Sequence, residues 1–119
     1  MESGPVVLII EDERAIRLAL AMALADEGFR VATASNGAIA LELLTEIEPQ
    51  VIVLDLQMPV LDGYEFAKAY RERVPAPAPV IVCSTRCSDR HIRALGARAM
   101  LSKPVDLDRL VDVVCQCLN

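Results

Sequence analysis

The chain has 119 residues, which is enough for about one domain with a substantial core. Its residues are 54% hydrophobic but only 3% aromatic, so we expect an aliphatic core without stacking platforms for single-stranded nucleic acid. A net charge of −5 argues against direct binding of nucleic acid. No apolar stretch approaches the roughly 18 residues that indicate a membrane span, so we expect no membrane insertion.

The N-terminus and the cysteines favour a cytoplasmic protein. Residues 1–5 lack the basic start of a signal peptide. The four cysteines lack zinc-ligand spacing, and they are more typical of small hydrophobic residues in a reducing compartment.

Short apolar runs alternate with segments of helical periodicity along the whole chain. Strands are predicted over Val6–Ile10, Arg30–Ala34, Val51–Leu54, Val80–Cys83 and Ala99–Leu101. Helices are predicted over Arg14–Glu27, Gly37 to about Ile47, Tyr64–Arg73, Arg90–Leu95 and Leu107–Leu118. This alternation predicts an α/β fold, a doubly wound parallel sheet of five strands with five helices and right-handed crossovers.

Acidic residues stand at the ends of two of these strands. Asp55 directly follows Val51–Leu54, and Glu11 and Asp12 directly follow Val6–Ile10. The carboxyl ends of parallel strands meet at one edge of the sheet, where α/β proteins bind ligands. Several carboxylates in one small space repel one another unless a cation neutralises them, so the pattern indicates a divalent metal.

Two further strand ends carry polar groups, Ser84-Thr85 after the fourth strand and Lys103-Pro104 after the fifth. In this order, the four features resemble the receiver domain of two-component response regulators. The stretches that carry the resemblance are Val7–Glu13, Val53–Gly63, Pro79–Ser84 and Gly96–Pro104. The resemblance covers essentially the whole chain. It implies a single receiver domain over residues 1–119, with a flavodoxin-like sheet of strand order 2-1-3-4-5.

The resemblance also implies a chemistry for this edge. Asp55 would accept a phosphoryl group from a sensor histidine kinase or a histidine phosphotransfer protein. Mg²⁺ (or Mn²⁺) would be held by Asp12, Asp55 and the backbone carbonyl of Gln57, with Glu11 acting through water. Lys103 would neutralise the phosphoryl oxygens, and its bond to Pro104 would be cis.

Ser84 would be the switch hydroxyl, which binds the phosphoryl group and passes the signal to a downstream output protein or domain. A phosphorylation-dependent dimer is compatible with this role. Gln57, Thr85 and Arg86 lie where they would tune the reaction, in particular the rate at which the phosphoryl group is lost.

The sequence departs from the family pattern at three places. Glu11 replaces the commoner aspartate, and Met100 stands where an aromatic switch residue is usual. The segment from Ser84 to Lys103 is about one helical turn shorter than usual. These departures bear on how the signal is transmitted more than on phosphorylation itself.

Two other functions compete with a phosphorylation switch. A phosphorylation-independent interaction module on the same fold would lack the acid cluster or the lysine, and both are present. A phosphohydrolase with an aspartate nucleophile would carry a second aspartate two residues on. That position is Gln57, which cannot donate a proton as a general acid. We therefore expect a switch that catalyses only its own phosphorylation and slow dephosphorylation.

Overall fold

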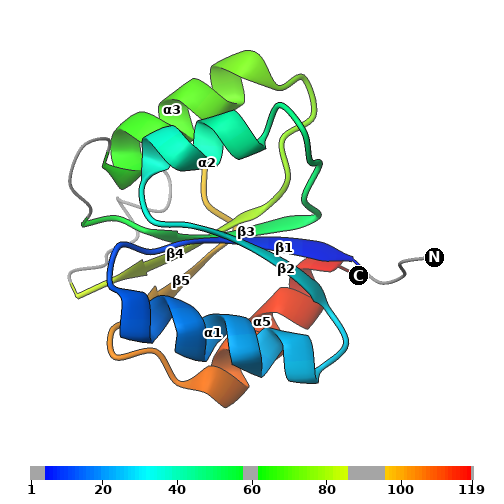
Figure 1. Ribbon diagram of the computed structural model, residues 1–119, viewed down its shortest axis with the longest axis vertical. Coiled ribbons are helices and arrows are strands. Elements are labelled where there is room, and N and C mark those ends of the chain that lie inside the picture. The colour runs from blue at the N-terminus through cyan, green and yellow to red at the C-terminus, as the bar shows by residue number, and fades with distance from the viewer. Residues whose placement is uncertain (1–4, 58–61, 86–95, 119) are drawn as a thin grey trace.

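A computed structural model describes residues 5–57, 62–85 and 96–118. Five parallel strands form one sheet in the order β2-β1-β3-β4-β5, so the predicted sheet is confirmed (Figure 1). The strands are β1 (Val6–Ile10), β2 (Arg30–Ala34), β3 (Val51–Asp55), β4 (Val80–Ser84) and β5 (Ala99–Ser102).

Helices cover both faces of the sheet, as in a doubly wound fold. Figure 1 shows α1 (Arg14–Asp26) and α5 (Leu107–Leu118) on one face, with α2 (Gly37–Leu43) and α3 (Gly63–Arg73) on the other. The described residues therefore contain four helices, whereas five were predicted. The fifth prediction, Arg90–Leu95, lies outside the described residues.

The core consists of two aliphatic layers, one on each side of the sheet. Successive side chains of a strand point to opposite faces, so each buried strand contributes to both layers. Toward α2 and α3, the layer includes Leu8, Ile10, Ile52, Leu54, Val82 and Phe66. Toward α1 and α5, it includes Val7, Ile9, Val53, Ile81, Leu24 and Leu110. Burial on both faces explains why β1, β3 and β4 are continuous apolar runs rather than alternating ones.

Helix α2 ends at Leu43, so the prediction that it continues to about Ile47 was wrong. The Thr45 N–H donates to the carbonyl of Glu42 and the Glu46 N–H donates to that of Leu43, at 3.1 and 2.9 Å. These bonds span three residues, so the chain tightens into turns there. The Thr45 hydroxyl also donates to the Glu42 carbonyl at 2.7 Å, a local bond that competes with helix continuation.

The start of α3 lies directly against the end of β3. An added Cβ atom at Gly63 would lie 2.8 Å from both the carbonyl oxygen of Asp55 and the Cα of Leu56. A capping box defines the first turn, because Asp62 and Glu65 accept each other's backbone N–H. Glycine is therefore required for the close approach between this helix and the carboxyl edge of the sheet.

Among the described residues, no helix combines the length and the apolar character that crossing a membrane demands.

Candidate functional site

Three carboxylates meet where β1 and β3 end. Asp55 is the last residue of β3, and Glu11 follows β1; each is only 2% exposed. Asp12, the next residue, is exposed. One carboxylate oxygen from each residue lies within 4.8 Å of the others. The parallel pairing of β1 with β3 produces this cluster. Ile10 lies beside Leu54, so the residues that follow them reach the same edge of the sheet.

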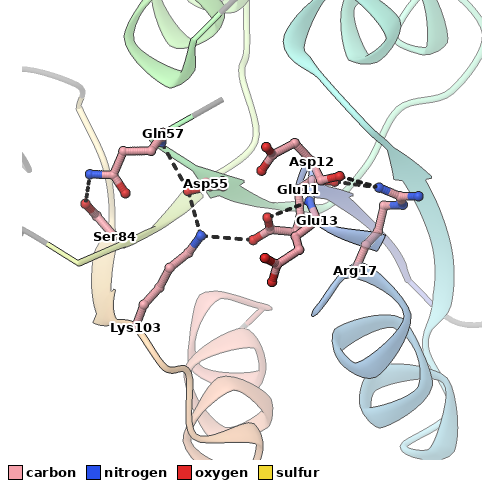
Figure 2. A network of polar contacts seen from close by, with 8 residues as sticks. All are labelled: Glu11, Asp12, Glu13, Arg17, Asp55, Gln57, Ser84 and Lys103. Carbon is pink, nitrogen blue, oxygen red and sulfur yellow. Dashed lines mark hydrogen bonds and ion pairs between the residues drawn. The ribbon is translucent and has the colours of Figure 1, made fainter. Parts of the chain in front are cut away.

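Lys103 forms ion pairs with both buried carboxylates and compensates part of their charge. Its Nζ lies 2.9 Å from Asp55 Oδ1 and 3.1 Å from Glu11 Oε1, so the ammonium lies between them (Figure 2). Burial lowers the pKa of Lys103, but hydrogen bonds and charges from Asp55 and Glu11 outweigh it, and the net pKa is raised. The ammonium therefore stays charged. The Lys103-Pro104 bond is cis, as the resemblance implies.

The pKa of Glu11 is raised above its usual value, so the charged form of this carboxylate is disfavoured. Burial raises its pKa, and the negative charge of Asp55 raises it further. The Glu13 N–H, which donates to Glu11 Oε2 at 3.1 Å, and the Lys103 ammonium act in the opposite direction without cancelling the rise. Burial first, and repulsion from Asp55 second, therefore still disfavour the charged form of Glu11, and an additional cation would reduce that cost.

Asp55 presents one oxygen that nothing in the described structure satisfies. Its Oδ1 accepts from Lys103 and from the Gln57 N–H at 3.1 Å. Its Oδ2 is buried and has no hydrogen-bond partner among the described residues. Native proteins rarely leave such an atom unpaired without a reason. Asp55 also lines a cavity of about 580 Å³, together with Glu11, Asp12, Gln57 and Lys103.

These residues fit a hard divalent cation. The donors are carboxylate oxygens, which Mg²⁺ prefers, and they are too few for a complete cage. Magnesium commonly keeps several waters, so an incomplete set beside an open cavity suits it.

Arg17 supports the acidic loop, and the sequence analysis did not identify it. Its Nη1 donates to the backbone carbonyls of Glu11 and Asp12 at 2.9 and 3.3 Å (Figure 2). The available signal was its position on α1, one helical turn after Glu13, where the side chain can reach back to the preceding loop. Arg17 thus ties the loop that carries two of the carboxylates to the helix that follows it.

Of the predicted switch and tuning residues, Gln57 and Ser84 are linked to this cluster by hydrogen bonds. Ser84, the last residue of β4, is fully buried, and its Oγ accepts from Gln57 Nε2 at 2.9 Å. Thr85 follows it and is exposed. Met100 pairs with Val82 across β4 and β5 and is partly buried. Arg86 lies outside the described residues.

The family model of the response regulator receiver domain matches residues 7–115. The chain belongs to this family. It is a receiver domain of the two-component type, and such domains work with histidine kinases and are not typically enzymes in their own right.

Individual relatives agree with this assignment. The receiver is 44% identical over 104 residues to the transcriptional regulatory protein AfsQ1 of Streptomyces coelicolor, covering 85% of this chain and 45% of that protein. The structure of the chemotaxis protein CheY4 of Vibrio cholerae matches 98% of this chain and 100% of its own, with a TM-score of 0.91 and 31% identity. The response regulator TrrA of Thermotoga maritima, in complex with Mg²⁺ and BeF, matches 96% of this chain and 99% of its own, with a TM-score of 0.84 and 29% identity. The chain spans about half or less of the length of the first curated relatives that it matches.

Proposed function

We propose that this receiver is a cytoplasmic phosphorylation switch, a single domain that accepts a phosphoryl group on Asp55. The donor is a phosphohistidine of a sensor histidine kinase or a histidine phosphotransfer protein. The observation that carries the proposal is the buried Oδ2 of Asp55, which has no hydrogen-bond partner among the described residues, while Oδ1 is held by Lys103 and Gln57. Asp55 itself lines the acidic cavity.

The arrangement suits attack by the carboxylate on phosphorus. Asp55 Oδ2 forms the new bond to phosphorus as the bond between phosphorus and the donor's histidine nitrogen breaks, and that nitrogen retains the electron pair. A carboxylate is a weak nucleophile, so its position and the surrounding charge govern the rate. Lys103, already 2.9 Å from Asp55, is the compact positive charge available to the transferred oxygens.

A bound Mg²⁺ would supply further positive charge to those oxygens. Asp12 and Asp55 would hold it directly, the backbone carbonyl of Gln57 would be a third ligand, and Glu11 would act through water. TrrA, a relative of the same fold, is known in complex with Mg²⁺ and BeF, which supports a metal and an anion at this edge. Ser84 would then bind the phosphoryl group, and the change would pass to an output protein or domain, or to a second copy in a phosphorylation-dependent dimer.

Chemical phosphorylation tests the proposal without knowledge of the kinase. We expect acetyl phosphate with Mg²⁺ to add one phosphoryl group to the protein, measured as intact mass. The gain should vanish in Asp55→Asn and persist in Asp112→Asn, a matched change on the exposed face of α5. An unmodified wild-type protein that is folded would instead favour the phosphorylation-independent interaction module. Equal gains in wild type and Asp55→Asn would assign the acceptor elsewhere.

A further inference from the structure

Gln57 connects the acceptor aspartate to the buried serine. Its backbone N–H donates to Asp55 Oδ1 at 3.1 Å, and its side-chain Nε2 donates to Ser84 Oγ at 2.9 Å. Figure 2 shows the side chain extending away from Asp55 and toward Ser84. Gln57 is itself exposed, whereas Ser84 is fully buried. Holding a long, exposed side chain in one conformation costs conformational entropy, so an ordered contact of Gln57 with a buried hydroxyl calls for a physical explanation.

The backbone around Ser84 is held by both neighbouring strands. The Lys103 N–H donates to the Ser84 carbonyl at 3.0 Å, and the Leu56 N–H donates to the Cys83 carbonyl at 3.2 Å. Ser84 pairs with Ser102 in the ladder between β4 and β5. With its backbone held in this way, the Ser84 hydroxyl can change partners most easily by rotation about χ1, with little movement of the chain.

We propose that Gln57 is a positioning residue that retains the Ser84 hydroxyl in the resting state. This inference rests on the proposed function, since it concerns the step after a group is attached to Asp55. The hydrogen bond between Gln57 and Ser84 must break before the hydroxyl can turn to that group. Gln57 thereby opposes the switch, and the strength of this hydrogen bond sets the contribution that Gln57 makes.

The size of the effect follows from the net value of a hydrogen bond. Such a bond favours one arrangement over another by a factor of about two to ten. A ligand that needs the turned hydroxyl binds more weakly in proportion to how rarely that arrangement is populated. Removing the bond should therefore increase the apparent affinity for a phosphoryl mimic by about the same factor.

Titration with fluoroberyllate in the presence of Mg²⁺ measures this directly. Gln57→Met keeps the length of the side chain and removes its donor. We expect the variant to bind fluoroberyllate about two- to tenfold more tightly than wild type. Gln116→Met, the same change on the exposed face of α5, should bind like wild type. Equal or weaker binding by Gln57→Met would overturn the inference.

A double-mutant cycle separates this role from a direct contact between Gln57 and the ligand. In Ser84→Ala the retained hydroxyl is absent, so adding Gln57→Met should no longer change the affinity. If the gain persists in the Ser84→Ala background, Gln57 acts on the ligand itself and the inference fails.

Scalar couplings of the Ser84 β-protons give a readout that needs no ligand. We expect Gln57→Met to redistribute the χ1 rotamers of Ser84 in the free protein, and unchanged couplings would overturn the inference. Absence of fluoroberyllate binding by wild type would contradict the proposed function instead, while the couplings would still decide the resting contact.

Discussion

At the scale of single residues, Lys103 compensates part of the negative charge of the candidate site. It contacts two carboxylates that are almost completely buried, one from β3 and one from the end of β1. Removing one partner of a buried ion pair costs more than the pair contributes, because the remaining charge loses its compensation. Lys103 should therefore matter for folding as well as for phosphorylation.

Lys103→Met should lower the free energy of unfolding by about 3–5 kcal/mol in metal-free protein, because Glu11 and Asp55 then lose the positive charge between them. Urea denaturation in EDTA at neutral pH measures this loss. Lys68→Met on the exposed face of α3 is the control and should change stability by less than about 0.5 kcal/mol. Equal losses in the two variants would show that the ion pairs are energetically unimportant.

The raised pKa of Glu11 makes stability depend on pH. Above the usual value of 4.5, the unfolded chain has lost the Glu11 proton while the folded protein still holds it. The unfolded state then binds fewer protons, so the free energy of unfolding falls as pH rises from 4.5 through the folded pKa. Glu11→Gln lacks this loss. Its stability relative to wild type should rise with pH across that window, in urea titrations with EDTA. A relative stability that declines with pH would contradict the assignment.

Sequence reasoning placed the acidic residues, Ser84 and Lys103 because each stands at or close to the carboxyl end of an apolar strand, and strand ends determine position along the edge. It did not find Arg17 or the bond between Gln57 and Ser84. Those contacts depend on which rotamer a long side chain adopts among several neighbours, and no periodicity in the sequence records that choice. Arg86 stays a prediction, since it lies outside the described residues.

At the scale of elements, the junction of β3 with α3 is closely packed. The strand ends at Asp55, and α3 begins at Gly63 in van der Waals contact with the backbone of Asp55 and Leu56. The position of the Asp55 carboxylate is thus linked to the position of α3, which packs on the core layer that contains Leu54 and Phe66.

Gly63→Ala should destabilise the protein by about 1–3 kcal/mol, because the new methyl group would overlap backbone atoms that cannot rotate away. It should also slow phosphorylation by acetyl phosphate, since the Asp55 carbonyl must shift to accommodate it. Thermal unfolding and intact mass over time measure the two effects. Ala69→Ser, a small enlargement farther along the same helix, provides a comparison. Unchanged stability in Gly63→Ala would mean that the junction is looser than the distances indicate.

The element boundaries illustrate a limit of reading the sequence. Residues 44–47 are apolar or helix-compatible, so the pattern continues past Leu43, but turns spanning three residues end the helix first. β4 extends through Ser84 because Ser84 pairs with Ser102 and so continues the ladder with β5. The end of β4 therefore depends on its partner strand. Boundaries depend on tertiary contacts that a local pattern does not contain.

For the whole molecule, the sheet order could be predicted and the charge balance could not. Continuous apolar runs in β1, β3 and β4 indicated strands buried on both faces, and the structure has them at the centre of the sheet. The ion pairs of Lys103 and the unpaired state of Asp55 Oδ2 among the described residues depend on distances of a few ångströms between groups on three strands. They emerge only once those strands are assembled.

Binding of Mg²⁺ should stabilise the assembled protein against unfolding. At a Mg²⁺ concentration 100 times the dissociation constant, the gain is about 2.7 kcal/mol, seen as a rise in the midpoint of thermal unfolding. Asp12→Asn should largely abolish this rise, and it leaves both described ion pairs of Lys103 in place. Asp26→Asn at the exposed end of α1 should retain it. A full Mg²⁺ response in Asp12→Asn would place the cation outside the acid cluster.

The hydrogen bond from the Lys103 N–H to the Ser84 carbonyl has a consequence for how this chain tolerates insertions and deletions. It belongs to the ladder between β4 and β5, so strand register sets the spacing of the lysine and the serine, whatever the number of residues that connect them. A crossover that loses a helical turn can leave both groups in position. The positions of the two groups thus depend on the pairing of β4 with β5 rather than on the number of residues in the connection.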